Sequence, residues 1–257
     1  MIHFQDVSVA DHDTALLHGI TLRAAPGELT VLMGPNGAGK STLVKTLTGE
    51  SQDYDGAILL AGKALQDWSD TERALRLAYV PQHIERGLSV DVLDYVLQGR
   101  YAIHGGRPER PDYNAALQAL EECDVATLAL HDVLTCSGGE LRRIAIARAI
   151  AQLRHTEADA SDRVIVLDEP TAHLDPRHAA TVAALLRTLA VRSGWTVLTV
   201  LHDIPLALRY GHSIAVLVNG RLSWVGAAAA SPTALTTAYG VAIHRVDVAG
   251  ESTVVVI

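Results

Sequence analysis

The chain has 257 residues, which is long for one domain and short for two. Hydrophobic residues make up 49% of it and aromatic residues only 4%, so a large core can form mainly from Ala, Val, Leu and Ile. The formal net charge of −8 argues against nucleic acid as the main partner, because phosphate contacts need clustered Lys and Arg side chains.

The first eighty residues have the pattern of strands with one helix. The apolar run Leu29–Met33 is too short for an ordinary helix and predicts a buried strand. Apolar residues then recur at helical spacing from Lys40, and Gly49 lies where such a helix would stop. Ile58–Leu60 and Leu77–Val80 predict two further strands.

The stretch from about Val90 to Ala151 is predicted to be a helical insert. Apolar residues recur at helical spacing around Leu93 and again around Ala116, and Gly105-Gly106-Arg107-Pro108 separates the two stretches. Residues from Gly138 to the end of the insert predict a helix rich in Ala, Ile and Arg.

Strand and helix patterns alternate again after this insert. Val164–Leu167, Thr196–Leu201 and Ser213–Val218 predict strands, and Ala179–Val191 predicts a helix. The polar segment His155–Asp162 is expected to be a surface loop. This alternation indicates a mainly parallel sheet with helices on both faces.

A glycine-rich loop follows the first predicted strand, with the sequence Gly34-Pro35-Asn36-Gly37-Ala38-Gly39-Lys40-Ser41. Its glycines allow the backbone to fold round a phosphate, and the next helix offers its positive N-terminal end. The Lys40 ammonium would reach the β and γ phosphates, and the Ser41 hydroxyl would hold Mg²⁺. The alternative is a glycine turn that only caps a helix, but the flanking strand and helix favour a phosphate site.

Two further motifs carry polar side chains. Asp168 and Glu169 follow a predicted buried strand, where Asp168 can hold Mg²⁺ through its water shell and Glu169 can polarise an attacking water. Ser137-Gly138-Gly139-Glu140 begins the Arg-rich helix and forms a second anion-binding shape. Taken alone, the first motif could be a solvated strand end or a helix cap, and the second a plain N-cap.

These motifs together resemble the ATPase subunits of ATP-binding cassette (ABC) transporters over nearly the whole chain. Ser137-Gly138-Gly139-Glu140 is similar to the signature sequence of the family, and Gln82 to its Q-loop glutamine. Ala172-His173-Leu174-Asp175 is similar to its D-loop, and His202 to its switch histidine. Alone, Gln82 would be a loop residue, His202 a partner of a backbone group and Asp175 a helix cap.

The resemblance implies an α/β fold of the P-loop NTPase type, with a mainly parallel sheet flanked by helices. It also implies a helical subdomain insert and an N-terminal antiparallel β portion. Residues 1–257 would form a single ATPase domain, with the nucleotide-binding core at about 1–82 and 155–257 and the helical subdomain at about 83–154.

The resemblance further implies a head-to-tail homodimer, in which each ATP lies between the phosphate loop of one subunit and the Ser-Gly-Gly turn of the other. Ser41, Gln82 and Asp168 would organise Mg²⁺. Glu169 would orient water, His202 would contact the γ-phosphate, and these two would form the catalytic set with Gln82. The implied nucleotide-binding residues are Gly34, Pro35, Asn36, Gly37, Ala38, Gly39, Lys40, Ser41, Thr42, Ser137, Gly138, Gly139, Glu140 and Asp175.

The chain departs from the family pattern at two places. Cys136 stands where the family usually has Leu, at a position expected to pack rather than react. An aromatic residue that would stack on adenine is not evident near Asp11, where His12 is the candidate substitute.

Several local features resemble importers of iron chelates, hemin and cobalamin. These are Asp67-Trp68-Ser69, Gly99-Arg100-Tyr101 and the Ser-Gly-Gly-Glu form of the signature. Ala151-Gln152-Leu153 with its following polar loop is most similar to hemin importer ATPases, and the tail Val241–Ile257 fits that subfamily. The expected cargo is therefore hemin, with cobalamin or an iron-siderophore as the alternatives.

Two alternatives from other classes remain at this point. A soluble iron–sulfur assembly ABC ATPase is also a single cassette, although the helix from Leu141 to Ala149 resembles transporter cassettes more closely. A scaffold that binds ATP without useful hydrolysis is disfavoured by the presence of Glu169 and His202.

The expected partners are transmembrane permease subunits and, indirectly, a substrate-binding protein, with no nucleic acid. The permease is expected to dock around His83 to Tyr95. No apolar run approaches the roughly 20 residues that cross a bilayer. The two cysteines, Cys123 and Cys136, and a start without a secretory leader fit a reduced compartment, so we expect a peripheral position on the cytoplasmic face of the cell membrane.

Overall fold

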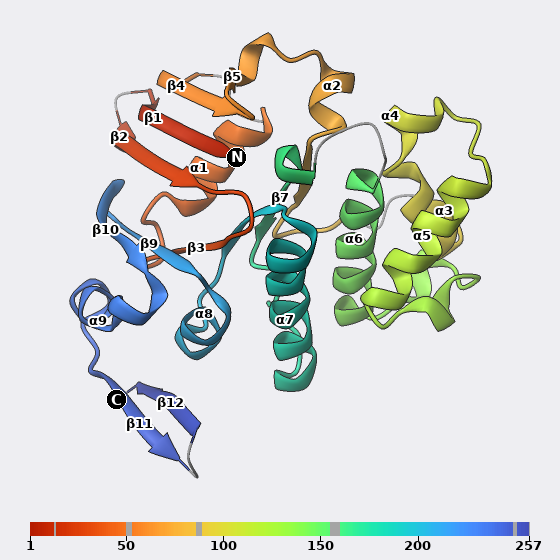
Figure 1. Ribbon diagram of the computed structural model, residues 1–257. Coiled ribbons are helices and arrows are strands. Elements are labelled where there is room, and N and C mark those ends of the chain that lie inside the picture. Colours follow the sequence, from red (N-terminus) through yellow and green to blue (C-terminus); the bar gives the residue numbers. More distant parts are fainter. Residues whose placement is uncertain (13, 50–52, 86–88, 155–159, 249–250, 257) are drawn as a thin grey trace.

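The computed structural model describes residues 1–12, 14–49, 53–85, 89–154, 160–248 and 251–256 (Figure 1). The strands are β1 Ile2–Asp11, β2 Thr14–Ala24, β3 Leu29–Met33, β4 Asp55–Leu60, β5 Lys63–Ala64, β6 Leu77–Val80, β7 Val164–Asp168, β8 Thr196–Val200, β9 Ser213–Val218, β10 Arg221–Ala227, β11 Ile243–Val248 and β12 Glu251–Val256. The α-helices are α1 Lys40–Thr48, α2 Asp70–Ala74, α3 Val92–Gln98, α4 Tyr101–His104, α5 Arg110–Glu122, α6 Gly138–Leu153, α7 Pro176–Ser193, α8 Ile204–Tyr210 and α9 Pro232–Tyr239.

The central sheet has the strand order β10-β9-β3-β8-β7-β6. All of its neighbouring strands run parallel except the antiparallel pair of β9 and β10. The prediction of a mainly parallel sheet is therefore confirmed. Because β3, β8 and β7 are neighbours and parallel, the segments that follow them leave the sheet at the same edge.

Alternate residues of the central strands enter two different cores. On β7, Ile165 and Leu167 pack with α3, α5, α6, α7 and α8, whereas Val164 and Val166 pack with α1, β1, β2 and β4. Side chains on successive strand residues point to opposite faces of a sheet, so a strand buried on both faces must be apolar throughout. This explains why Val164–Leu167 is a continuous apolar run in the sequence.

The prediction that helices cover both faces of the sheet is only partly correct, because the second face is covered by one helix and a second sheet. There, α1 lies between the central sheet and an antiparallel sheet of order β2-β1-β4-β5. The N-terminal antiparallel β portion implied by the family resemblance is thus confirmed. The pattern of β1 and β2, in which buried and exposed residues largely alternate, follows from one packed and one open face.

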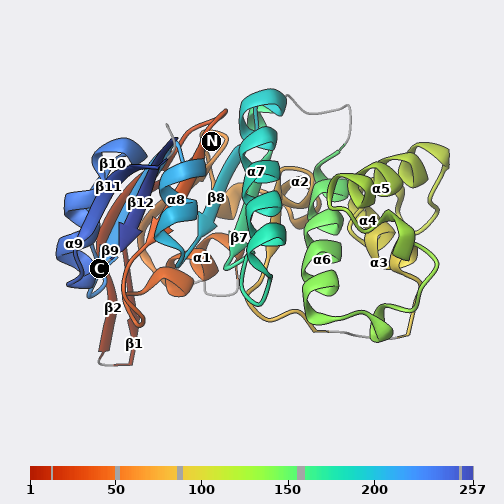
Figure 2. The ribbon, with the colours of Figure 1, turned by 90° about the horizontal axis from the view of Figure 1, so that it is seen from below.

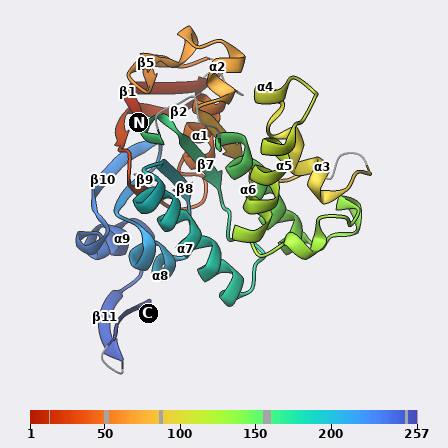
Figure 3. The same cartoon turned by 45° about the vertical axis from the view of Figure 1, so that its right-hand side comes forward.

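The helices α3, α5 and α6 pack on one another and lie on the opposite side of the molecule from β1 and β2 (Figures 2 and 3). They are the structural counterpart of the predicted insert. The exact boundary of the helical subdomain at about residues 83–154 stays a prediction. Residues 155–159 of the predicted surface loop lie outside the described residues, and Ala160–Asp162 forms a short 3₁₀ turn.

Local sequence signals fix several helix ends. Gly49 and Gly194 end α1 and α7 with φ of 82° and 72°, a left-handed conformation in which glycine carries no steric penalty. The sequence pattern does not predict α2, which begins at a Ser69 N-cap that forms a capping box with Glu72, so the described part of the first eighty residues contains two α-helices and not one. The tail from Ile243 forms the hairpin β11–β12, in agreement with its predicted strand-like pattern.

A buried ion pair connects the helical elements. The Arg100 Nε donates to Asp112 Oδ1 at 2.9 Å, and its Nη1 donates to the backbone carbonyls of Ala151 and Arg154. The second carboxylate oxygen of Asp112 accepts from the Glu109 N–H at 2.8 Å, and both partners are less than a tenth exposed. Burial pushes the pKa of Asp112 upward, but these hydrogen bonds outweigh it and leave the pKa below its usual value.

We predict that Asp112→Ala lowers the free energy of unfolding by about 3 kcal/mol, because the buried Arg100 charge loses its partner. Chemical denaturation at pH 7 measures this loss. The exposed pair of Asp70 with Arg73 provides the control, and Asp70→Ala should cost less than about 1 kcal/mol. A carboxylate with a lowered pKa stabilises the fold above its unfolded pKa, so the loss should shrink as the pH falls below about 4. An equal loss in both variants would contradict the role of the buried pair.

Candidate active site

The glycine loop joins β3 to α1. At two of its positions, the backbone conformation and the close neighbours leave room only for glycine. Gly34 has a φ of 146°, and a Cβ atom there would lie 2.0 Å from the carbonyl oxygen of Leu217. Gly39 has a φ of 100°, and a Cβ atom there would lie 2.6 Å from the Leu17 side chain. The loop is therefore pressed against β9 and β2, and larger residues at these two positions would displace it.

Lys40 is 6% exposed, and its side chain folds back over the loop. Its Nζ donates to the carbonyl of Gly34 at 2.8 Å and to the carbonyl of Pro35 at 2.9 Å. Burial lowers the pKa of Lys40, and the charges of Glu169 and Asp168 oppose this shift. The ammonium is thus held at the loop by backbone carbonyls and lies close to two carboxylates.

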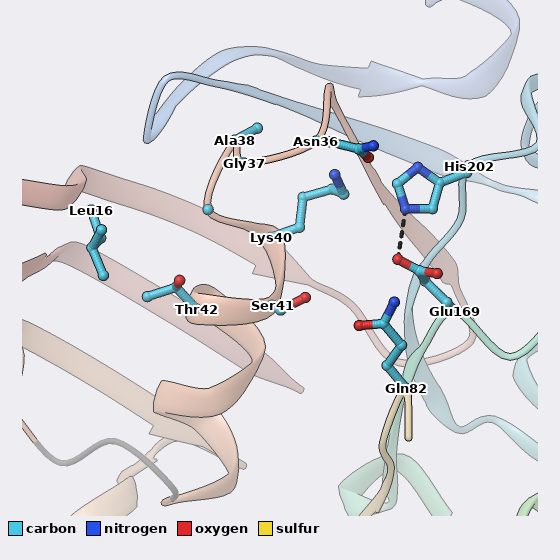
Figure 4. A pocket seen from close by; sticks show the side chains of 11 residues that line it. Leu16, Asn36, Gly37, Ala38, Lys40, Ser41, Thr42, Gln82, Glu169 and His202 are labelled. Atoms are coloured by element: carbon cyan, nitrogen blue, oxygen red, sulfur yellow. Dashed lines mark hydrogen bonds and ion pairs between the residues drawn. The ribbon is translucent and has the colours of Figure 1, made fainter. Parts of the chain in front are cut away.

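A cleft of about 710 Å³ opens beside the loop (Figure 4). Lys40 and Ser41 lie on one side of it, and Gln82, Glu169 and His202 face them from the other side. Its lining residues are Leu16, Asn36, Gly37, Ala38, Gly39, Lys40, Ser41, Thr42, Gln82, Glu169 and His202. Residues predicted from four separate segments of the sequence are therefore brought together here.

The side chains of Glu169 and His202 contact each other across the ends of β7 and β8. The distance from His202 Nε2 to Glu169 Oε1 is 2.7 Å, drawn as a dashed line in Figure 4. Glu169 itself has a φ of 52°, which is uncommon for a residue with a Cβ atom, and its N–H donates to the Val200 carbonyl. A strained backbone at a carboxylate in a cleft is typical of functional sites.

Of the residues expected to hold Mg²⁺, Ser41 and Gln82 line this cleft, whereas Asp168 lines a neighbouring groove that Ser41 and Gln82 also line. Asp168 is 2% exposed, and burial raises the pKa of its carboxyl, which a hydrogen bond with Ser41 and the charge of Lys40 only partly reverse. Among the described residues, the Oδ1 atom of Asp168 has no hydrogen-bond partner. Mg²⁺ prefers carboxylate, hydroxyl and amide oxygens, so Asp168, Ser41 and Gln82 fit this ion by their chemistry.

The signature residues do not line this cleft. Ser137 is exposed at the N-terminus of α6, where its hydroxyl accepts from the Glu140 N–H and the Glu140 carboxylate accepts from Ser137. This is the N-cap geometry that the sequence left open as an alternative. Asp175 likewise caps α7 by accepting from the His178 N–H at 2.9 Å. Within one chain, neither the signature residues nor Asp175 line the cleft beside the glycine loop.

The candidate for adenine stacking is not placed in the cleft. His12 is exposed at the tip of the β1–β2 hairpin, where its Nδ1 lies 2.8 Å from Asp11. Leu16 of β2 lines the cleft instead. Its position in the sequence carries no signal for this role, because an isolated Leu in a strand has the pattern of a core residue. The departure at Cys136 is confirmed as a packing position, since its side chain is 5% exposed within the larger core.

The sequence identifies Arg142 only as part of an Arg-rich helix, but its contacts connect α6 to the Q-loop. Its guanidinium donates to the backbone carbonyls of Pro81 and Gln82, and the residue is 6% exposed. Burial lowers the pKa of Arg142, and Glu169 and Asp168 oppose the shift. The sequence signal that could have identified it is the pair of adjacent Arg residues within the apolar run of this helix, where both are buried.

Comparison with known proteins agrees with this geometry. A family model described as ABC transporter matches residues 17–172. The chain belongs to the ABC transporter family. It is an ATPase, and it carries the P-loop NTPase fold.

Three curated relatives show how far the sequence similarity extends. The hemin import ATP-binding protein of Gloeobacter violaceus is 43% identical over 82% of this chain and 76% of the relative. The proteins of the same name from Hahella chejuensis and Pseudomonas aeruginosa are each 39% identical, over 96% and 88% of this chain and 93% and 86% of their own lengths.

Solved structures agree with the fold of this ABC ATPase. A dimeric bacterial ABC transporter cassette has a TM-score of 0.76 at 26% identity and covers 89% of this chain and 99% of its own. A metal-chelate type ABC transporter in an inward-facing conformation has a TM-score of 0.81 over 100% of this chain and 97% of its own. At 24% identity, that second likeness supports the fold alone.

We predict that Arg142→Met lowers kcat for ATP hydrolysis about tenfold while the KM for ATP changes little, because the Q-loop backbone loses its anchor on α6. Steady-state phosphate release measures both constants. Arg143→Met is the matched control, since Arg143 is also buried on the same helix but donates to the backbone carbonyls of Cys123 and Asp124. An equal fall of kcat in both variants would indicate a general loss of stability instead.

Proposed function

We propose that this chain is the ATP-hydrolysing subunit of an importer that takes up hemin. The observation that carries the cargo assignment is the match to hemin import ATP-binding proteins, which reaches 96% of this chain for the Hahella chejuensis relative. Cobalamin and iron-siderophore importers remain the alternative cargo classes. A soluble iron–sulfur assembly ABC ATPase is the alternative outside transport.

The hydrolytic site is proposed to be completed by a second copy of the chain. Gly34 to Thr42 would bind the phosphates of ATP, and Ser137, Gly138 and Gly139 of the other copy would donate hydrogen bonds to the γ-phosphate. The exposed position of Ser137, outside the cleft of its own chain, supports this arrangement. A dimeric cassette among the related structures supports it as well.

Asp175 and Glu140 have supporting roles in this proposal. Their caps fix the starts of α7 and α6, so the D-loop and the signature turn would enter the dimer interface as ordered segments. A second groove, lined by Thr171, Leu174 and Pro176 together with Glu169 and His202, joins the D-loop to the catalytic end of the cleft.

Catalysis is proposed to proceed by positioning and electrostatic stabilisation, without a covalent intermediate. Ser41, Gln82 and Asp168 would hold Mg²⁺, which when bound neutralises charge on the phosphates. Lys40 would exchange its backbone acceptors for phosphate oxygens. Glu169 would orient the attacking water, and the contact with His202 supports this role because it fixes the direction of the carboxylate.

We predict that Glu169→Gln binds ATP and forms a stable dimer but hydrolyses ATP about a hundredfold more slowly, since the amide cannot accept a proton from water. Phosphate release gives the rate, and gel filtration with ATP and Mg²⁺ gives the dimer. Glu121→Gln, an exposed change on α5, should behave as wild type. Wild-type turnover of Glu169→Gln would remove Glu169 from the proposed role.

The membrane partner is proposed to be a permease that docks beside the Q-loop, which would place the chain on the cytoplasmic face of the membrane. None of the described helices combines the length and apolar character needed to cross a membrane. A groove of about 670 Å³ runs from Ser41 and Gln82 past Ile84 to Tyr95 and Arg148. It contains described parts of the predicted docking segment, of which residues 86–88 lie outside the described residues.

A short helix of the permease is the proposed occupant of this groove. Its connection to Gln82 and Ser41 supports this, because movement of the helix would then reach residues that are proposed to hold Mg²⁺. The substrate-binding protein would act on the permease and not on this chain, and the acidic net charge is consistent with the expectation that nucleic acid is not a partner.

We predict that cells expressing this chain with its permease take up hemin, and that Ile84→Glu abolishes uptake while the purified protein keeps its ATPase activity. A carboxylate in the half-buried Ile84 position would disfavour an apolar helix in the groove. Uptake of labelled hemin, cobalamin and ferric siderophore and co-purification of the permease provide the measurements. Ile103→Glu, on α4 and away from this groove, is the matched control.

Uptake of cobalamin or siderophore in place of hemin would replace the cargo assignment. Recovery of iron–sulfur assembly proteins without a multi-span membrane protein would favour the soluble alternative. Loss of ATP binding in Ile84→Glu would show that the docking surface has been misplaced.

A further inference from the structure

One hydroxyl group from the C-terminal part of the chain contacts both backbone groups of the first loop glycine. Tyr239 is the last residue of α9, 205 residues after Gly34. Its hydroxyl accepts from the Gly34 N–H at 2.9 Å and donates to the Gly34 carbonyl at 3.0 Å. Burial raises the pKa of the Tyr239 phenol, and the bond with Gly34 opposes the shift without reversing it, so the hydroxyl keeps its proton at neutral pH.

The position of Gly34 explains why it needs a partner outside the sheet. The parallel ladder between β3 and β9 ends with the pair Met33 and Val216, one residue before the glycine. Gly34 then turns away with a φ of 146° and lies against the Leu217 carbonyl. Backbone groups that leave a sheet in a buried region need other hydrogen-bond partners, and the Tyr239 hydroxyl supplies a donor and an acceptor together.

The Tyr239 side chain is held in place by α9. This helix starts after Ser231 and packs through Leu235, and both residues are fully buried. Gly240 ends it in the left-handed conformation with a φ of 68°. Figure 1 shows α9 beside β9, next to the start of the loop. The position of the hydroxyl is therefore fixed by a short helix that is itself packed against the core.

The Gly34 carbonyl accepts from two donors, Tyr239 at 3.0 Å and the Lys40 ammonium at 2.8 Å. A phosphate bound in the loop attracts the ammonium more strongly than a carbonyl does. When Lys40 turns to the phosphate, the Gly34 carbonyl keeps only the tyrosine. A buried carbonyl left without any donor would oppose that movement.

We propose that Tyr239 is a positioning residue for ATP binding, which keeps the Gly34 carbonyl hydrogen-bonded when Lys40 transfers to the phosphates. It acts through the loop and does not touch the nucleotide. This inference depends on the ATP site described above and is independent of the cargo.

Tyr239→Phe tests the inference, because it removes one hydroxyl and keeps the ring that packs α9. In the full-length protein with Mg²⁺, we expect the Kd for ATP and for ADP to rise about tenfold, with kcat at saturating ATP within about twofold of wild type. Calorimetric titration and steady-state hydrolysis give these values. Tyr210→Phe, the same change at the end of α8, is the control and should leave both constants unchanged.

A purely structural role is distinguished by the thermal stabilisation that nucleotide confers. We expect the rise in Tm on saturation with ADP to be smaller in Tyr239→Phe than in wild type, since the lost bond matters most when Lys40 has moved. An unchanged Kd, or a lower Tm with an unchanged ADP-induced rise, would overturn the inference. Wild-type protein that hydrolyses ATP but does not support hemin uptake would overturn the proposed function and leave this inference standing.

Discussion

The parallel hydrogen bonding of β3, β8 and β7 is the constraint on which the rest of the site depends. In this register Leu32 and Asp168 both pair with Val200, so the three strands end at the same edge. The glycine loop, Glu169 and His202 each follow one of these strands. Their proximity is therefore a consequence of strand order, and each strand must be apolar on both faces to occupy the centre of the sheet.

The charges at this edge are arranged as two buried cations near the buried carboxylate of Asp168 and the half-buried carboxylate of Glu169. Lys40 and Arg142 are both about 6% exposed, and each lies close enough to Asp168 and Glu169 for their charges to oppose the effect of burial on its pKa. Each cation also donates to backbone carbonyls, Lys40 to the glycine loop and Arg142 to the Q-loop. The same two side chains thus balance the acidic pair and hold the loops that surround the cleft.

Local patterns predicted much of the fold and of the site. The run Val164–Leu167 predicted a buried strand, and Gly49 marked a helix end, because both features act over a few residues of chain. Hydrophobic periodicity did not predict α2, because a helix of five residues is too short to show a helical repeat. This helix is defined mainly by its Ser69 capping box. His12 does not line the cleft: its side chain is exposed beside Asp11, whereas Leu16 of β2 does line it.

The sequence by itself determined the order of the motifs, the glycines that permit a phosphate loop and the caps at Ser137 and Asp175. These depend on neighbouring residues and on backbone preferences. Only the tertiary structure decided that Glu169 contacts His202, that Arg142 holds the Q-loop and that Tyr239 holds Gly34. These contacts join residues 33 to 205 positions apart. Such pairs depend on the strand order and on the packing of helices against the sheet, which no local pattern specifies.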